Sequence, residues 1–154
     1  MNKIGVFLIL LALGCNPRQE VISETDAIST IEGFFDALDV ENTDPELLDR
    51  YVTEDFLIYE AGKKMNKDEF VAFASVSDLV ASDWELSDFR VSSDNNSAHV
   101  SLFNRGNFVA QSETGKIQYK YQWLESAFLV KEAGMLKIKF YFSDNIGMES
   151  DTIP

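Results

Sequence analysis

Hydrophobic residues recur along this chain with two different periods, a helical one near the front and an alternating one in the second half. The first period joins four residues that would share one face of a helix: Ile28, Ile31, Phe35 and Leu38. Ser23, followed three residues later by Asp26, is typical of a helix start, because both side chains can accept hydrogen bonds from free amide groups. The pattern therefore predicts a first helix that begins after Ser23.

Two further helices and a short strand are expected before the alternating half begins. Asp44 and Pro45 are typical of a helix cap and a first helical position, so a second short helix is expected from there to about Val52. Asn66 and Glu69 have the spacing of a capping box, which predicts the start of a third helix. Between these two helices, the apolar segment 56–59 predicts a strand that a turn at 61–62 closes.

The second half of the chain reads as four strands, at 84–91, 98–110, 116–130 and 136–143. The turn-forming sequences SSDNN, SETG and EAG separate them. The clearest alternation puts four apolar side chains on one face: Ile117, Tyr119, Tyr121 and Trp123. In the last strand, alternation puts Leu136, Ile138, Phe140 and Phe142 on the buried face and Lys137, Lys139 and Tyr141 on the other. An antiparallel sheet with one buried face is expected.

These elements together predict one α+β domain, in which three N-terminal helices pack on a strongly curved, mostly antiparallel sheet. Strands of this length twist, and interruptions at Gly106 and at 125–126 favour bulges that curve them further. A curved sheet closed by helices forms a cone, and the wide end of a cone can leave a cavity.

Residues 1–15 resemble the signal sequence of bacterial lipoproteins. The apolar run 4–13 is too short to span a bilayer as a helix, which takes about 20 residues, but it fits the hydrophobic part of an export signal. Gly14 and Cys15 resemble the cleavage site of that class, whose cysteine is lipidated, although Ala12 stands where Leu is usual. An ordinary cleaved signal and a membrane anchor are the alternatives.

The lipoprotein interpretation divides the chain into a signal peptide at 1–14, the lipidated Cys15 with a tether at 15–22, a domain at 23–143 and a tail at 144–154. The tail is expected to be flexible because its sequence has no hydrophobic period. Two or more acyl chains anchor a protein stably, so an exported protein on the cell membrane or outer membrane is expected. Cys15 is the only cysteine, so a lipidated chain has no thiol left for a disulfide.

Acidic residues outnumber basic ones by 26 to 13, for a net charge of −13. The excess is concentrated between residues 15 and 60, where the only basic residues are Arg18 and Arg50. A surface of this sign repels phosphate backbones, so nucleic acid is not expected as a partner. A solvated acidic helical face accounts for the pattern without a specific function.

The order of elements resembles the NTF2-like superfamily, and in particular its SnoaL-like and small members without an assigned reaction. The segments that carry the resemblance are IEGFFDALDVENTDPELLDRYVTEDFLIYEAGKKMNKDEFVAF and FLVKEAGMLKIKFYFS. It implies a cone-shaped fold, many of whose members are homodimers through the outer face of the sheet. Members of that subgroup often carry Trp after the last hairpin glycine and His near the end of the final strand, where this chain has Leu136 and residues 140–142.

Two residues are candidates for acid–base catalysis. In ketosteroid isomerase, a member of this superfamily, the catalytic base is a carboxylate just after the first strand, and Glu60 falls near that place. The isomerase's oxyanion-hole Tyr and second acid have no evident counterpart in the sequence. In an apolar cavity, desolvation would raise the pKa of Glu60 toward neutrality, whereas at a solvated strand end it would have no role. His99 is the only histidine, and its alternative is an ordinary surface position in a strand.

Six aromatic residues are candidates for lining a ligand cavity: Phe35, Tyr59, Trp84, Tyr119, Tyr121 and Trp123. The simplest alternative is that they fill the core, but buried Tyr and Trp also need partners for their polar atoms. No zinc-ligand set, nucleotide-binding glycine loop or hydrolase elbow is present, and no cofactor is expected. Three functions stay open: binding of a small, largely apolar ligand, which is preferred, an isomerase, dehydratase or cyclase activity, and a non-catalytic dimer or partner-interaction role.

Overall fold

The computed structural model describes residues 20–75, 78–113 and 115–153, so the predicted signal peptide and Cys15 lie outside the described residues. Helix α1 (Glu24–Leu38) is followed by a short 3-10 helix, η1 (Leu47–Arg50), and by strands β1 (Val52–Glu60) and β2 (Lys63–Asn66). Helix α2 (Lys67–Ala74) comes next. Four long strands complete the fold: β3 (Leu79–Ser93), β4 (Ser97–Ser112), β5 (Gly115–Glu132) and β6 (Met135–Ile153).

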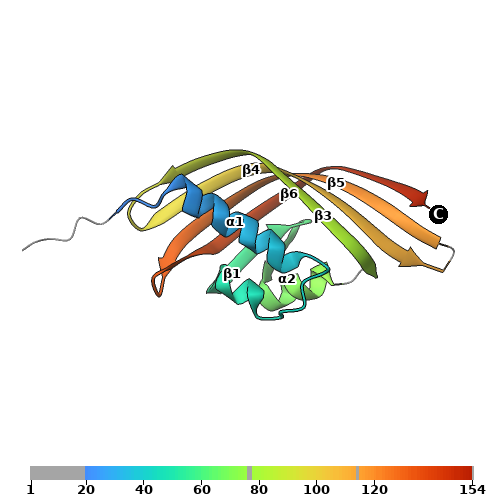
Figure 1. Cartoon of the computed structure of the whole chain (residues 1–154). Helices are drawn as coiled ribbons and strands as arrows, with labels where there is room; N and C mark the ends of the chain where they lie inside the picture. The colour runs from blue at the N-terminus through green and yellow to red at the C-terminus, as the bar shows by residue number, and fades with distance from the viewer. Residues whose placement is uncertain (1–19, 76–77, 114, 154) are drawn as a thin grey trace, which may run out of the picture.

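All six strands form one sheet in the order β2-β1-β6-β5-β4-β3. Neighbouring strands are antiparallel except β1 and β6, which pair in parallel, so the sheet is mixed. The four long strands arch over α1, which crosses their concave face, while α2 lies beside β1 and β2 (Figure 1). This is the predicted α+β arrangement with helices on one face of a curved sheet.

The first and last helices begin where the capping residues predict. The Ser23 side chain accepts a hydrogen bond from the Asp26 amide at 3.0 Å. Asn66 and Glu69 form the reciprocal capping box at the start of α2, with bonds of 2.9 and 3.0 Å. Both caps satisfy amides that have no partner inside the helix.

The prediction of a second helix from Asp44 to about Val52 is wrong, because only the short 3-10 helix η1 forms there. Helical structure does not continue to Val52, because Val52 already pairs with Ile138 of β6 and has extended backbone there. The Tyr51 carbonyl accepts a 2.7 Å hydrogen bond from the Ile138 amide at the same place. The chain thus enters the sheet at Val52, several residues before the predicted strand. The described part of the chain therefore has two α-helices rather than three.

The predicted flexible tail at 144–154 is also wrong, because β6 continues to Ile153. Its final residues pair with the first half of β5, from Asp144 opposite Leu124 to Ile153 opposite Lys116. The segment is polar and mostly exposed, so no hydrophobic period reveals it. The backbone partners offered by β5 suffice to order it.

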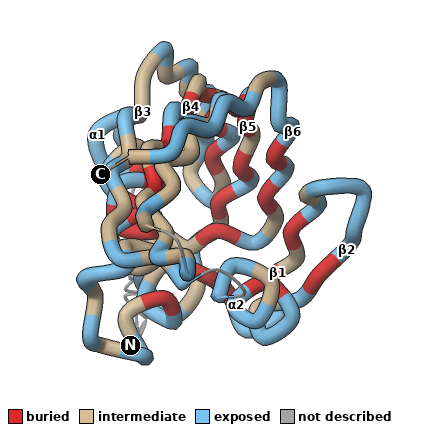
Figure 2. Tube along the Cα trace, turned by 90° about the vertical axis from the view of Figure 1, so that its right-hand side faces the viewer, coloured by how far each residue is buried: buried red, intermediate tan, exposed pale blue. Residues whose placement is uncertain are grey.

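The core lies between the concave face of the sheet and the helices. Buried and exposed residues alternate along β5 and β6, as expected for a sheet with one covered face (Figure 2). From α1, Ile31 and Phe34 are almost fully buried, and from the sheet Val100, Leu129 and Ile138 are too. The sheet and the helices thus share one continuous core.

Tyr141 departs from the predicted alternation, since it is only 1% exposed although the sequence pattern places it on the outer face. The reason is a bulge: Phe128 pairs with Phe140 and Leu129 with Ile138, so Lys139 is an extra residue in β6. The side chains from Phe140 to Asn145 therefore face opposite to the simple pattern, up to a second bulge at Ile146. Phe142 is turned out to 43% exposure as a result.

Candidate functional site

A cavity of about 610 Å³ lies between the concave face of the sheet and the two helices. Its walls are mainly aromatic, with contributions from α1, α2 and every strand except β2. The aromatic wall on the three strands β3, β4 and β5 consists of Trp84, Phe108, Tyr119, Tyr121 and Trp123. A group of polar residues from β1, β5 and β6 also lines it: Glu60, Glu125, Tyr141, Ser143 and Asn145.

The aromatic wall is an ordered stack of rings rather than a random cluster. Tyr121 and Trp123 are nearly parallel with ring centroids 5.1 Å apart, and Tyr119 continues the stack 6.3 Å from Tyr121. On the same wall, the ring centroid of Trp84 lies 6.0 Å from that of Trp123 and 4.9 Å from that of Phe35 of α1. Alternate residues of β5 place the three stacked rings on one face, as the sequence predicts.

Five of the six aromatic candidates line the cavity: Phe35, Trp84, Tyr119, Tyr121 and Trp123. Tyr59 does not, because Ile58 and Glu60 on either side of it face the cavity and alternation turns Tyr59 outward. Tyr59 is 41% exposed and packs edge-on against Phe140, with ring centroids 5.1 Å apart.

The two acid–base candidates lie on opposite faces of the sheet. Glu60 lines the cavity, and burial raises the pKa of its carboxyl to about 7. His99 is exposed on the outer face, where its Nε2 atom lies 2.7 Å from the Ser126 hydroxyl. The structure thus does not bring His99 to the cavity, and of the two only Glu60 is placed to act on a ligand there.

Glu125, which sequence reasoning missed as a site residue, lies in one row with Glu60. Both residues pair with Ser143 of β6, Glu60 from β1 and Glu125 from β5, so Ser143 stands between them. Two strand spacings place the two backbones about 10 Å apart. Since both side chains face the same cavity, they approach closely enough for the charge of Glu60 to raise the pKa of Glu125.

Glu125 is 7% exposed, and two neighbours on β6 hold its carboxyl group. The Tyr141 hydroxyl donates to Oε2 at 2.9 Å and the Ser143 hydroxyl donates to Oε1 at 3.2 Å. Burial raises its pKa to about 7, and the two hydrogen bonds limit the rise. The pKa of Tyr141 is raised well above 10 by its own burial and by the neighbouring Glu125, so it stays a donor at neutral pH.

Two buried polar groups close to the cavity make no hydrogen bond of good geometry with the described residues. Asn104 is fully buried, and its amide lies near enough to Glu125 to lower the pKa of that carboxyl. Neither polar atom of the Asn104 amide makes a hydrogen bond of good geometry with the described residues, and neither does the buried Nε1 of Trp84. Buried polar atoms without partners are uncommon in folded proteins and are found at functional sites.

A pattern in the sequence could have identified Glu125 as a cavity residue, whereas no pattern identified Tyr141 as one. The alternation that ends at Trp123 reaches Glu125 in one more step, which places this carboxylate on the aromatic face. The bulge at Lys139 hides Tyr141, because no residue in that segment marks the change of face.

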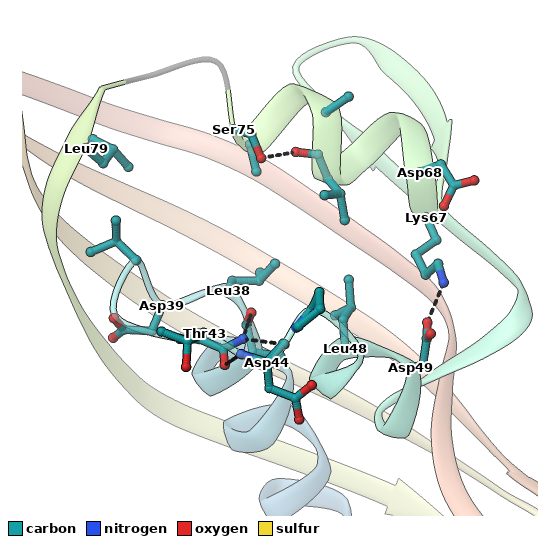
Figure 3. Close-up of a pocket in the computed structure, with 17 residues that line it drawn as sticks. Leu38, Asp39, Thr43, Asp44, Leu48, Asp49, Lys67, Asp68, Ser75 and Leu79 are labelled. Carbon is teal, nitrogen blue, oxygen red and sulfur yellow. Dashed lines mark hydrogen bonds and ion pairs between the residues drawn. The ribbon is translucent and has the colours of Figure 1, made fainter.

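A second hollow of about 740 Å³ lies on the surface between α2 and the segment from Ala37 to Asp49. Figure 3 shows Lys67 of α2 reaching down to Asp49, with which it forms an ion pair. Asp44 is likewise bound, through Arg50 and the Glu46 amide. Since these polar groups are satisfied by one another, this hollow has less capacity for chemistry than the cavity that holds Glu60 and Glu125.

No helix among residues 20–75, 78–113 and 115–153 is long and apolar enough to cross a membrane. Within these same residues, no three His, Cys, Asp or Glu side chains come together as a metal site requires.

No protein-family model matches the sequence, and no curated protein matches it. Solved structures do match. A candidate scytalone dehydratase from Novosphingobium aromaticivorans DSM 12444 is 14% identical, with a TM-score of 0.66 over 84% of this chain and 88% of that one. The association domain of C. elegans CaMKII is 16% identical, with a TM-score of 0.61 over 78% and 93%.

An NTF2-like protein from Cytophaga hutchinsonii ATCC 33406 is 18% identical, with a TM-score of 0.57 over 81% of this chain and all of that one. At such identities the likeness concerns the fold and not the activity. The arched six-stranded sheet, the helices on its concave face and these structural neighbours agree: the chain has the NTF2-like fold.

Proposed function

We propose that this protein binds a small, largely apolar ligand in the cavity and transfers protons on it, as isomerases and dehydratases do. The observation that supports this is the pair of carboxyl groups, Glu60 and Glu125, in a cavity with aromatic walls. Both have a pKa raised to about 7, so each is present in both protonation states near neutral pH. General acid–base catalysis works best with groups of this kind.

The hydrogen bonds suggest a division of roles between the two carboxyls. Glu60 makes no side-chain hydrogen bond with the described residues, so its ionised form is free to take a proton from carbon. Glu125 is fixed in place by Tyr141 and Ser143, and in its protonated form it can donate to the oxygen on which charge develops. Return of the proton from Glu60 to another carbon isomerises the ligand. If protonated Glu125 instead gives its proton to a hydroxyl of the ligand, that hydroxyl leaves as water and the ligand is dehydrated.

Exchange of carbon-bound hydrogen in D₂O tests the proposal without knowledge of the natural substrate. A panel of cyclic ketones and enones would be incubated with the protein, and deuterium at the carbon next to the carbonyl measured by mass spectrometry. We expect exchange that falls about a hundredfold in Glu60→Gln, within the range that a general base contributes. His99→Gln on the outer face is the control and should exchange at the wild-type rate. Absence of exchange in ketones that demonstrably bind would contradict the catalytic proposal.

Binding without turnover is the second candidate, and one observation favours it. Both oxygens of Glu125 already accept hydrogen bonds from the protein, as they would if the carboxyl only shaped and polarised a binding cavity. In that case ligands that co-purify with the protein would be found by mass spectrometry, and they would bind without any hydrogen exchange.

We also propose that the protein is exported and anchored to a bacterial membrane through a lipid on Cys15. The support is the sequence pattern before this cysteine, where Gly14 follows a short apolar run. Cys15→Ser should release the protein from the membrane fraction, because acyl chains would no longer hold it. Unchanged fractionation would contradict the proposal.

Finally, we propose that the protein forms a homodimer through the outer face of its sheet. Four apolar side chains there are 39–51% exposed on the neighbouring strands β1, β6 and β5: Tyr59, Phe142, Phe128 and Leu124. Contiguous apolar surface of this kind marks interaction sites. A structural neighbour is itself named an association domain.

A further inference from the structure

The charged side chains that line the cavity are all acidic, and proton transfer alone does not require this. Its acidic lining groups are Glu60 on β1 and Glu125 on β5, and its other titratable lining groups are the hydroxyls of Tyr119, Tyr121 and Tyr141. No Lys, Arg or His is found among the described residues that line it, including those from α1, α2, β3 and β4. Lys63 of β2 pairs with Glu60 and holds its ammonium 4.9 Å from the centroid of the Phe73 ring, but it is not a lining residue. An anionic ligand would therefore meet no cation among the lining residues.

The aromatic walls have the same preference as the carboxyls. The faces of aromatic rings carry a partial negative charge, so they attract cations that lie over them. Tyr121 and Trp123 are stacked with an angle of 17° between their planes, and Trp84 and Phe35 face the same cavity from other elements. A positive charge between these rings and the two carboxyls would be stabilised by both.

We infer that this cavity binds lipophilic organic cations, with an ammonium group against Glu60 and Glu125 and an apolar body along the rings of Tyr121 and Trp123. A volume of about 610 Å³ lies within the range of sites for drug-sized ligands. The inference uses the same cavity as the proposed function, but it requires only binding and no turnover.

Binding of a cation must be coupled to the release of a proton. Because both carboxyls have a pKa of about 7, at acidic pH they are mostly protonated and must ionise to pair with the ammonium group. Affinity for a cation should therefore rise by about tenfold for each pH unit below the pKa, if one carboxyl is coupled, and level off above it. The pKa of Tyr141 lies well above this range, so its hydroxyl stays protonated throughout.

Three probes with one aromatic body test the inference by calorimetry on the purified protein: (4-phenylbutyl)trimethylammonium, 4-phenylbutanol and 4-phenylbutyrate. The quaternary ammonium keeps its charge at every pH, so only the protein titrates. At pH 8 we expect the ammonium to bind at least tenfold more tightly than the alcohol, and the carboxylate to bind most weakly. Between pH 5 and pH 7 the ammonium should gain affinity about tenfold per unit and release about one proton.

Variants separate the cavity from the general negative charge of the protein. Glu60→Gln should lose at least tenfold in ammonium affinity at pH 8 and weaken its pH dependence, and Glu125→Gln provides a second variant if Glu60→Gln does not fold. Glu85→Gln is the matched control, because Glu85 is exposed on β3 beside Arg105 and its change removes the same charge. It should bind the ammonium as the wild type does.

Each outcome decides a different question. If the alcohol binds as tightly as the ammonium at pH 8, or if ammonium affinity does not depend on pH, the inference is overturned while a cavity for apolar ligands stands. If Glu85→Gln loses as much affinity as Glu60→Gln, binding is a surface charge effect and the inference is also overturned. If none of the three probes binds, both the inference and the ligand-binding part of the proposed function are overturned. A missing hydrogen exchange with intact ammonium binding would remove the catalytic proposal alone.

Discussion

Glu125 experiences opposing effects on its pKa, and their balance determines its ionisation. Hydrogen bonds from Tyr141 and Ser143 favour the ionised carboxylate, whereas burial and the nearby charge of Glu60 favour the protonated acid. The pKa is about 7, so burial is the larger effect. The residue is therefore poised between two charge states inside the core, where ionisation is costly.

Replacing Glu125 by Gln should change how stability depends on pH. The pKa of Glu125 is about 7 in the folded protein, against an ordinary value of 4.5, so the folded protein binds this proton more tightly. Its contribution to stability is fully present below about pH 4.5 and is lost as the pH rises through 7. Urea unfolding at pH 5 and pH 8 should show a loss of about 2 kcal/mol from this carboxyl in the wild type. The Glu125→Gln variant should lack this part of the loss, and identical pH profiles would contradict the assignment.

Asn104 illustrates a residue whose burial costs stability. Its amide is fully buried and makes no hydrogen bond of good geometry with the described residues, although it lies close enough to Glu125 to lower the pKa of that carboxyl. Leu has a similar size and no polar atoms, so Asn104→Leu should raise the free energy of unfolding by about 1 kcal/mol. The pKa of Glu125 should rise further, because the amide of Asn104 lowers it. Urea unfolding and NMR titration of the Glu125 carboxyl measure the two effects, and a loss of stability in the variant would show that the amide is satisfied.

At the scale of elements, close packing of rings on β4 and β5 depends on Gly106. A Cβ atom at this position would lie 2.5 Å from the Phe108 ring and 2.9 Å from the Trp123 ring. Both rings are more than nine-tenths buried, so they have little room to move. The glycine is needed for this close approach and not for an unusual backbone angle.

Gly106→Ala should therefore destabilise the protein by about 1–3 kcal/mol, the usual cost of overpacking. It should also change the tryptophan fluorescence, since Trp123 and its neighbour Trp84 both line the cavity. Gly147→Ala in β6 is a matched control, because the nearest atom to its added Cβ would be Gln122 Cβ at 3.9 Å. The control should unfold within about 0.5 kcal/mol of the wild type. Equal losses in both variants would indicate a general effect of removing glycine from a strand.

The sequence predicts a helix or strand well when residues that are close together in the sequence determine it. The caps at Ser23 and Asn66 and the one-sided rings of β5 follow from side chains close in sequence, and the structure has them as expected. The short turn in place of a second helix and the ordered end of β6 do not follow, because both depend on backbone bonds to strands distant in the chain.

The same distinction applies to the site. Tyr119, Tyr121 and Trp123 follow from the alternation along β5, and Phe35 follows from the helical period of α1. Glu60 follows instead from the resemblance to ketosteroid isomerase. The rest of the polar side of the cavity does not follow from the sequence, because Tyr141 reaches Glu125 only through the bulge at Lys139. A bulge shifts every later side chain to the other face, and its position is set by pairing with β5 rather than by its own sequence.

At the scale of the whole molecule, the two faces of the sheet have different properties. The concave face encloses the acidic and aromatic cavity, while the convex face exposes the apolar side chains of Tyr59, Leu124, Phe128 and Phe142. Phe142 lies centrally among them, since it pairs with Tyr59 on one side and with Ser126 on the other. A net charge of −13 opposes association of two copies, so an apolar contact must overcome repulsion that salt screens.

A dimer through this face should be broken by one charge at its centre. Phe142→Asp would place a carboxylate opposite its own copy in a desolvated contact, and such a buried like-charge pair costs several kcal/mol. In sedimentation velocity the wild type is expected as a dimer that strengthens with salt, and Phe142→Asp as a monomer. Val80→Asp is the matched control, because Val80 is 49% exposed on β3, at the far edge of the sheet from β1. A wild type that stays monomeric at high salt would exclude this interface, whereas dissociation in both variants would place the contact elsewhere on the molecule.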